Sequence, residues 1–423
     1  MKRPLLVIFI LFLSQIILST YGNRIFHQAY NPLALMAISI LFTMYSFQWL
    51  ARERPTPDRQ AAGLAAGPWL YALAGMLGLF AAYEELRKIW AQYPEPEKIS
   101  DVLPQLQTQC QRFFAGEFPY QIVKMPNHEA FPVYMPLHWM PVQIAGAAGI
   151  DIRWSGMILL LLAVGVAGYW LAKRHPSASW KLALPGILLF ALPVWAYIFW
   201  ARLDIAVSLE TVVAAWYLLL AAGLASKNHV LIAIGICGAL LSRYTLLFWI
   251  PMFAILLWLH APRSLSYRLW GAVLVACIAL FVAPFWLKDP SILSKILAYY
   301  SGCSEGSWLR PDEYTFLDAL SLNIHLRHWL PGTPEENLRF AHVPQIAVQL
   351  LTAGLGMWFY QKKWRQQMDV YTFSLLALSI MIMLFYIFSP MLFKYYMLMP
   401  LTVSAVVCWK VLADFHINSS KVL

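Results

Sequence analysis

Apolar runs of about 20 residues recur along almost the whole chain and constrain its fold more than any other feature. A helix of that length crosses the hydrocarbon core of a bilayer. Hydrophobic residues make up 60% of the 423 residues and charged residues only 12%, with a mean hydropathy of +0.60. A water-soluble domain could not bury so much apolar surface. We therefore predict an all-α polytopic membrane protein with about 12 transmembrane helices.

The predicted spans order the topology. They cover residues 5–20, 31–50, 68–86, 154–172, 182–200, 205–222, 230–241, 246–260, 270–287, 341–360, 370–389 and 396–412. With the amino terminus inside, basic clusters in short loops, such as Lys173 with Arg174 and Lys362 with Lys363, fall on one side, as expected because short-loop Lys and Arg resist translocation. The proline-containing stretch 131–149 then cannot cross, and we expect it to lie at the interface.

The domain organisation follows from these spans. The whole chain, 1–423, reads as a single transmembrane domain with two long outward loops, 87–152 and 288–340, that carry short surface helices. The formal net charge is +10, but the basic residues orient the spans, so we expect no nucleic-acid partner. Cys110 and Cys303 lie in the two loops, and the sequence leaves open whether they pair.

The first outer loop contains an amphipathic segment preceded by an acidic residue. Asp101 stands just before residues 103–114, and Gly116 and the Pro119–Tyr120 pair follow. We expect a short helix on the membrane surface that holds Asp101 near the headgroup plane. A solvated carboxylate, or a cap for this helix, is the simpler alternative.

Five segments form an ordered series along the chain. They are FAGEFPY, VYMPLHWMP, WARLDIAVSLE, GALLSRYTLLFWIP and SPMLFKYYMLMP. In this order they resemble motifs of the GT-C superfamily of membrane glycosyltransferases, which use a polyprenyl-phosphate sugar as donor. The series is similar to the protein mannosyltransferase, aminoarabinose transferase and family-87 mannosyltransferase branches, although Met135 stands where their Y-P-P-L pattern has its first proline.

The resemblance implies an inverting GT-C-type glycosyltransferase that moves a hexose or pentose, mannose among the candidates, to a lipid, glycan or protein acceptor. Such chemistry needs a carboxylate to take the acceptor proton and cations to hold the phosphate. By resemblance Asp101 is the general base, Asp204 completes the catalytic site, and Arg243 and Lys394 hold the phosphate. The other predicted substrate-binding residues are Arg153, Tyr120, Tyr134 and Tyr395.

Several of these residues could instead have purely structural roles. Asp204 could pair with Arg202, Arg243 could snorkel to the interface, and Lys394 could be an interfacial anchor. Glu210 lies at membrane depth, where carboxylates usually face a polar interior. No metal site is predicted from His128, Glu129, His325 and His328, whose spacing is not diagnostic, although a divalent metal stays open as a cofactor.

Two other classes of function remain at this stage. A transporter or flippase of lipid-linked sugars would need polar groups along a path through the membrane, and a non-catalytic scaffold would keep only remnants of the motifs. The few trusted charges lie at outer span ends, which favours catalysis on the outer side of the membrane. Since the sequence has no large outer domain or glycosylation-rich segment, we expect a bacterial inner membrane. The identities of the sugar and the acceptor do not follow from the sequence.

Overall fold

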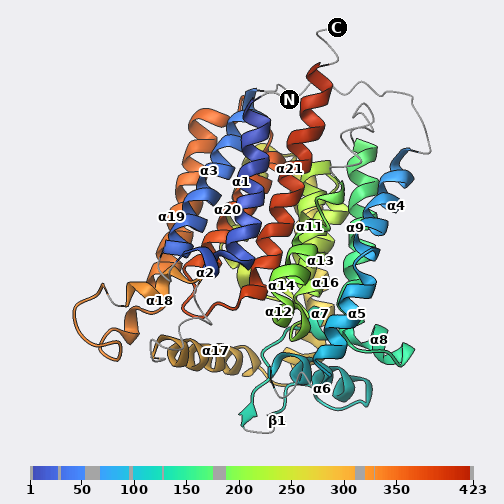
Figure 1. The fold of residues 1–423 in the computed structure, drawn as a ribbon, viewed down its shortest axis with the longest axis vertical. Coiled ribbons are helices and arrows are strands. Elements are labelled where there is room, and N and C mark those ends of the chain that lie inside the picture. Colours follow the sequence, from blue (N-terminus) through green and yellow to red (C-terminus); the bar gives the residue numbers. More distant parts are fainter. Residues whose placement is uncertain are drawn as a thin grey trace.

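The computed structural model describes residues 3–26, 30–52, 67–94, 99–125, 128–174, 187–309, 320–327 and 329–419. The fold is a bundle of roughly parallel and antiparallel helices (Figure 1). Strands occur in the described ranges only as a short hairpin, β1 (Val123–Lys124) with β2 (Glu129–Ala130). The prediction of a helical architecture is therefore confirmed, whereas the count of about 12 spans stays a prediction.

The apolar helices run along the long axis of the bundle (Figure 1). They are α1 (Arg3–Thr20), α3 (Tyr30–Arg52), α4 (Gly67–Phe80), α9 (Arg153–Arg174), α11 (Leu192–Trp200), α13 (Glu210–Ser226), α14 (His229–Leu240), α15 (Trp249–His260), α16 (Arg263–Cys277) with the π-helix η3 (Ile278–Trp286), α19 (Val343–Phe359), α20 (Val370–Ile387) and α21 (Leu398–Ser419).

Short elements connect these helices. They are α2 (Gly22–Ile25), α5 (Tyr83–Gln92), α6 (Val102–Phe114), α7 (Pro136–Trp139), α8 (Val142–Ala148), α12 (Arg202–Ala206), α17 (Ile292–Trp308) and α18 (Leu322–Leu326), with 3-10 turns η2 (Tyr244–Leu247), η5 (Leu338–Phe340) and η7 (Lys394–Met397) and the π-helical turn η6 (Tyr360–Trp364).

Five helices of the described ranges are long and apolar enough to cross a membrane. They cover Tyr30–Arg52, Arg153–Arg174, Arg263–Trp286, Val370–Ile387 and Lys394–Asp414. Four shorter apolar helices accompany them, at Pro4–Thr20, Glu210–Ser226, His229–Leu240 and Trp249–His260. These lengths and compositions are those of a membrane protein.

The centre of the bundle is formed by α13, α20 and α21. The apolar window of α20 is 94% buried and that of α21 is 100% buried, whereas the window of α16 and η3 is only 22% buried. Since apolar side chains of a membrane helix can face either protein or lipid, α20 and α21 are interior helices, and α16 presents an apolar outer face.

Three predicted spans are interrupted in the ranges that the structure describes. The range 68–86 breaks at Ala81 and Ala82, so that α5 starts a new direction after α4. The range 205–222 breaks at residues 207–209, between α12 and α13. The range 182–200 has turns at residues 189–191, before α11, and its residues 182–186 lie outside the described ranges. Apolar periodicity does not reveal such breaks, because all of the interrupting residues except Ser208 are themselves apolar. The interfacial stretch 131–149 contains only α7 and α8.

Small residues let α13 and α14 pack closely. A Cβ added at Gly235 would lie 2.5 Å from the Cα of Leu220, and one added at Gly223 would lie 2.7 Å from the backbone nitrogen of Ile232. Glycine is therefore required at this helix crossing, as in other close helix pairs of membrane proteins.

We expect Gly235→Ala to destabilise the bundle by about 1–3 kcal/mol, because the methyl group would force two backbones apart. The measurement is the thermal unfolding temperature of the detergent-solubilised protein. Gly271→Ala is the matched control, since nothing lies within 4 Å of the added Cβ there. Equal unfolding temperatures for the two variants would contradict the close approach of α13 and α14.

Candidate functional site

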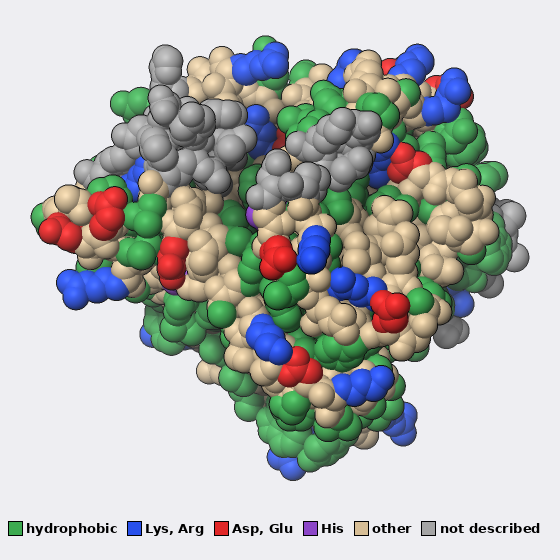
Figure 2. All heavy atoms as spheres, turned by 90° about the horizontal axis from the view of Figure 1, so that it is seen from below, with side chains coloured by type: hydrophobic (Ala, Val, Ile, Leu, Met, Phe, Trp, Pro, Cys, Tyr) green, Lys and Arg blue, Asp and Glu red, His purple; other side chains and the backbone are tan. Residues whose placement is uncertain are grey.

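The elements of the two long loops collect at one end of the bundle, opposite the end at which both termini lie (Figure 1). This end comprises α5, α6, α7, α8, α12 and α17. Seen from below, it presents acidic and basic side chains interspersed with polar and apolar ones (Figure 2). The predicted catalytic loop and its charged residues therefore meet at a single face.

Asp101 immediately precedes α6, as the amphipathic pattern predicted, and the helix begins at Val102. Its side chain makes no capping hydrogen bond, so helix capping does not account for it. Instead, Oδ2 of Asp101 accepts a hydrogen bond of 2.8 Å from Nε2 of Gln105. Asp101 also interacts electrostatically with Tyr134 in the loop and with Tyr299 on α17. The carboxylate is thus half-buried between α6 and α17.

An aromatic cluster anchors α6 to the bundle. The ring of Phe285, in the π-helix η3, lies 5.6 Å from Phe113, 5.5 Å from Tyr120 and 5.8 Å from Trp139, measured between ring centroids. Edge-to-face contacts of this kind stabilise beyond simple burial. The π-helix η3, which contains Pro284, therefore places Phe285 against the loop that carries Asp101.

Tyr120 and Tyr134 are both buried in this loop. The hydroxyl of Tyr120 donates to the backbone carbonyl of Tyr134 over 3.2 Å, and Nε2 of Gln109 donates to the same carbonyl over 3.1 Å. Burial raises the pKa of Tyr134 well above its ordinary value, with the Asp101 charge adding to the effect. Tyr120 therefore supports the loop, and Tyr134 is the tyrosine that faces the charged groups.

Arg243 and Glu210 form a buried ion pair. Arg243 lies at the apex of the hairpin between α14 and α15 and is 5% exposed, while Glu210 begins α13 and is 1% exposed. Nη1 of Arg243 donates to the hydroxyls of Tyr300 over 3.0 Å and Tyr396 over 3.5 Å. The guanidinium lies 4.4 Å from the ring centroid of Tyr396 and 5.5 Å from that of Tyr134. Arg243 is thus held inside the protein and does not snorkel to the interface.

The pair keeps some unused hydrogen-bonding capacity. Within the described ranges, Nε of Arg243 and Oε2 of Glu210 are buried and have no hydrogen-bond partner. Buried polar atoms without partners are costly and are usually satisfied by water or a ligand. Nε of Arg243 can therefore donate a hydrogen bond to an additional anion, although Glu210 already neutralises the charge of the guanidinium.

Asp204, Lys394 and Tyr395 form the adjoining part of the site. Asp204 accepts a hydrogen bond from the backbone N–H of Tyr395 and interacts with the Lys394 charge. Burial outweighs these favourable contacts and raises the pKa of Asp204 to about 6. In the described ranges Arg202 makes no ion pair with Asp204, and its Nε donates to the Ile198 carbonyl over 3.1 Å.

These two parts are continuous. The ring of Tyr395 lies edge-on against Tyr396 at 4.8 Å, and Tyr396 contacts Arg243. Tyr134 in turn interacts electrostatically with both Arg243 and Asp101. We call the connected set the outer polar cluster, and its members are Asp101, Tyr134, Asp204, Glu210, Arg243, Lys394, Tyr395 and Tyr396.

Arg153 plays a different part from the one predicted. Its Nε and Nη2 bond to the Asp151 carboxylate over 2.9 and 2.5 Å, and the remaining N–H groups donate to the carbonyls of Tyr93, Ala206 and Trp90. A guanidinium has five N–H donors, and all are used. Arg153 therefore ties α5 and α12 to the start of α9, and the prediction that it holds a phosphate is corrected.

No disulfide or metal-ligand group is found at this cluster in the described ranges, although the Cys303 thiol interacts electrostatically with Asp101. The five cysteines are free thiols, so Cys110 and Cys303 do not pair. Sγ of Cys110 instead donates to Oε1 of Gln143 over 3.7 Å. In the ranges that the structure describes, no three His, Cys, Asp or Glu side chains come together as metal ligands, and His328 lies outside those ranges.

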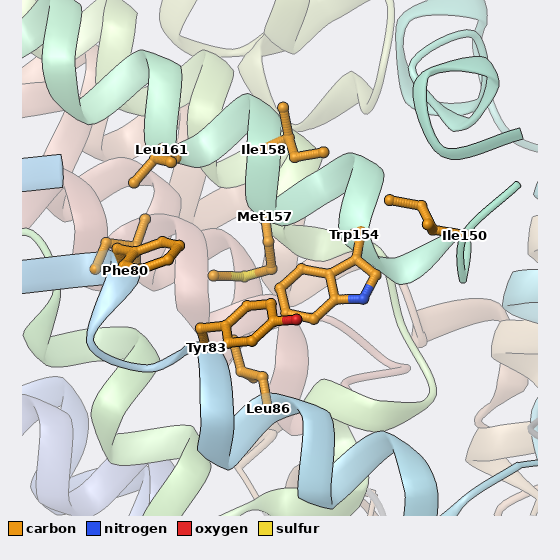
Figure 3. A pocket seen from close by; sticks show the side chains of 9 residues that line it. Phe80, Tyr83, Leu86, Ile150, Trp154, Met157, Ile158 and Leu161 are labelled. Atoms are coloured by element: carbon orange, nitrogen blue, oxygen red, sulfur yellow. The ribbon is translucent and has the colours of Figure 1, made fainter. Parts of the chain in front are cut away.

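An apolar cavity of about 280 Å³ lies beside the bundle's outer end (Figure 3). The cavity lies between the α4–α5 bend and α9. The residues that line it are Leu79, Phe80, Tyr83, Leu86, Ile150, Trp154, Met157, Ile158 and Leu161. None of these residues belongs to the outer polar cluster. Next to the lining residue Trp154, Arg153 bonds to the α12 end at Ala206, two residues after Asp204.

Comparison with known proteins adds no relative: no family model, curated protein or solved structure matches the chain.

Several residues of the site were not predicted. Gln105 and Gln109 are buried on α6, four residues apart, and this spacing of polar residues on the buried face of an amphipathic helix was an available signal. Tyr300 lies in the second outer loop, and no local pattern distinguishes it. Tyr396 belongs to a matched motif but was not selected.

We expect Arg243→Ala to destabilise the fold by about 3–5 kcal/mol, because the Glu210 carboxylate would be left buried without its partner. The measurement is thermal unfolding in detergent. The double variant Arg243→Met with Glu210→Leu should recover most of this loss, since both charges are then absent. A stable Arg243→Ala protein would show that the pair does not hold the hairpin to α13.

Proposed function

We propose that this protein is a membrane glycosyltransferase that moves a sugar from a polyprenyl-phosphate carrier to an acceptor on the extracytoplasmic side. The observation that carries the proposal is the continuity of the outer polar cluster: the half-buried carboxylate of Asp101 is linked through Tyr134 to Arg243, and Arg243 is linked through Tyr396 and Tyr395 to the Lys394 side of the site, at one end of a bundle of apolar helices. A proton acceptor beside phosphate-binding cations is the constellation that this displacement requires.

The proposed reaction is a single displacement. The Asp101 carboxylate takes the proton of the acceptor hydroxyl, and the oxygen attacks the anomeric carbon while the bond to the phosphate oxygen breaks. Lys394 and Arg243 stabilise the negative charge on the departing polyprenyl phosphate. Attack from the side opposite the leaving group inverts the anomeric configuration.

The membrane arrangement supports this proposal. We infer that the chain crosses the bilayer about 12 times and that the outer polar cluster faces away from the cytoplasm, since Lys173, Arg174, Lys362 and Lys363 belong to the opposite helix ends. A bacterial inner membrane fits this reading. The cavity between α4–α5 and α9 has an apolar lining. Part of an apolar polyprenyl chain could therefore lie in it at little desolvation cost.

We expect Asp101→Asn to lower sugar transfer by about 100-fold or more while leaving the protein folded, because the amide cannot accept the proton. The assay uses purified protein in native-lipid nanodiscs, a panel of radiolabelled polyprenyl-phosphate hexoses and pentoses, and detection of the transferred label. Glu117→Gln is the matched control, being an exposed carboxylate in the same loop.

Two outcomes would contradict this proposal. Full transfer by Asp101→Asn would exclude Asp101 as the base. Movement of intact labelled lipid across the membrane of proteoliposomes, without release of the sugar, would instead identify a flippase of lipid-linked sugars.

We expect donor binding to strengthen as the pH falls from about 8 to about 5. The pKa of Asp204 is raised to about 6, so below this pH the neutral carboxyl stops competing with the donor phosphate for Lys394. The phosphodiester of the donor does not itself titrate in this range. The measurement is the Kd of polyprenyl-phosphate mannose as a function of pH, and Asp204→Asn should flatten the curve at the low-pH affinity. A wild-type affinity that falls on acidification would reverse the assigned role of Asp204.

A further inference from the structure

Gln105 is a buried polar residue in direct contact with Asp101. Its side chain is 1% exposed, and its Nε2 donates to Oδ2 of Asp101 over 2.8 Å. The two residues are four positions apart, so the bond spans the first turn of α6. Within the described ranges Oδ1 of Asp101 accepts no hydrogen bond. One carboxylate oxygen is thereby fixed, and the other is left for the acceptor hydroxyl.

The surroundings hold Gln105 itself in place. Its neighbours Leu103 and Leu106 are buried on the same helix, and Gln109, one turn further, bonds to the Tyr134 carbonyl. Because α6 is clamped by the aromatic cluster through Phe113, the amide of Gln105 has little freedom. A buried amide is costly unless its hydrogen bonds are made, and the bond to Asp101 satisfies the Nε2 group of Gln105, whereas Oε1 is buried without a hydrogen-bond partner in the described ranges.

We infer that Gln105 is a positioning residue for Asp101, orienting the carboxylate so that Oδ1 faces the proton it removes. This inference rests on the proposed function and adds to it a residue that does not touch the substrate. Without the amide, the Asp101 side chain can rotate at the start of the helix. Misplacement of a reacting group by about 1 Å can lower the rate by about 100-fold.

The test compares Gln105→Leu with Gln107→Leu. Both remove one amide from α6, but Gln107 is exposed and does not contact Asp101. With polyprenyl-phosphate mannose as the probe donor, we expect Gln105→Leu to lower kcat by about 10- to 100-fold and to leave KM within about twofold, because the base is misoriented while the donor contacts remain. Gln107→Leu should leave both constants unchanged.

A double variant separates this role from a structural one. In the Asp101→Asn background, Gln105→Leu should cause no further loss, because the carboxylate that Gln105 orients is already gone. Gln105→Met, which keeps the length of the side chain and removes the donor, should reproduce the loss in kcat while the protein stays folded. An unchanged kcat in Gln105→Met, or an equal further loss in the Asp101→Asn background, would overturn the inference.

The same measurements distinguish the two proposals. If Asp101→Asn keeps full transfer, the proposed function fails in its base, whatever Gln105→Leu does. If Asp101→Asn is inactive but Gln105→Leu is fully active, only the role of Gln105 is overturned.

Discussion

The buried ion pair between Arg243 and Glu210 is the interaction on which the outer end of the structure depends. It joins the apex of the α14–α15 hairpin to the first residue of α13, one of the three central helices. Two charges are tolerated there because each neutralises the other and because Tyr300 and Tyr396 supply further contacts. The tyrosines that surround the guanidinium in turn hold the second outer loop and the last hairpin against the bundle.

Charge balance decides what this cluster can bind. Three carboxylates, those of Asp101, Asp204 and Glu210, accompany the two cations Arg243 and Lys394. In the proposed reaction, a donor phosphate would have to compete with these carboxylates for the two cations. Protonation of Asp204 would relieve this competition at Lys394, whereas Glu210 would stay paired with Arg243. Under this proposal Lys394 is the cation that is more readily available to a donor phosphate, and Arg243 would contribute through its unused Nε.

The sequence predicted those features that depend on local pattern. The helical architecture follows from apolar length, and the helix after Asp101 follows from amphipathic spacing, with the start at Val102 against the predicted residue 103. The partners of the charged residues could not be predicted in this way. Arg243 pairs with a residue 33 positions away, and Arg153 uses carbonyls 53 to 63 positions away, so both depend on how helices cross. The break at residues 207–209 was missed because Val207 and Leu209 are apolar and a single serine between them does not interrupt an apolar run.

The position of Asp101 is set by packing at some distance from it. Phe285 belongs to a membrane helix, yet its contacts with Phe113, Tyr120 and Trp139 determine where α6 lies. A regular α-helix would rotate the residues after Ile278 by a different angle, so the π-helical turn is what directs Phe285 toward the loop. The carboxylate is therefore oriented at close range by Gln105 and placed at longer range by an aromatic contact between the membrane bundle and the outer loop. A catalytic base on a loop can be precise only when the loop is fixed to a rigid helix in this way.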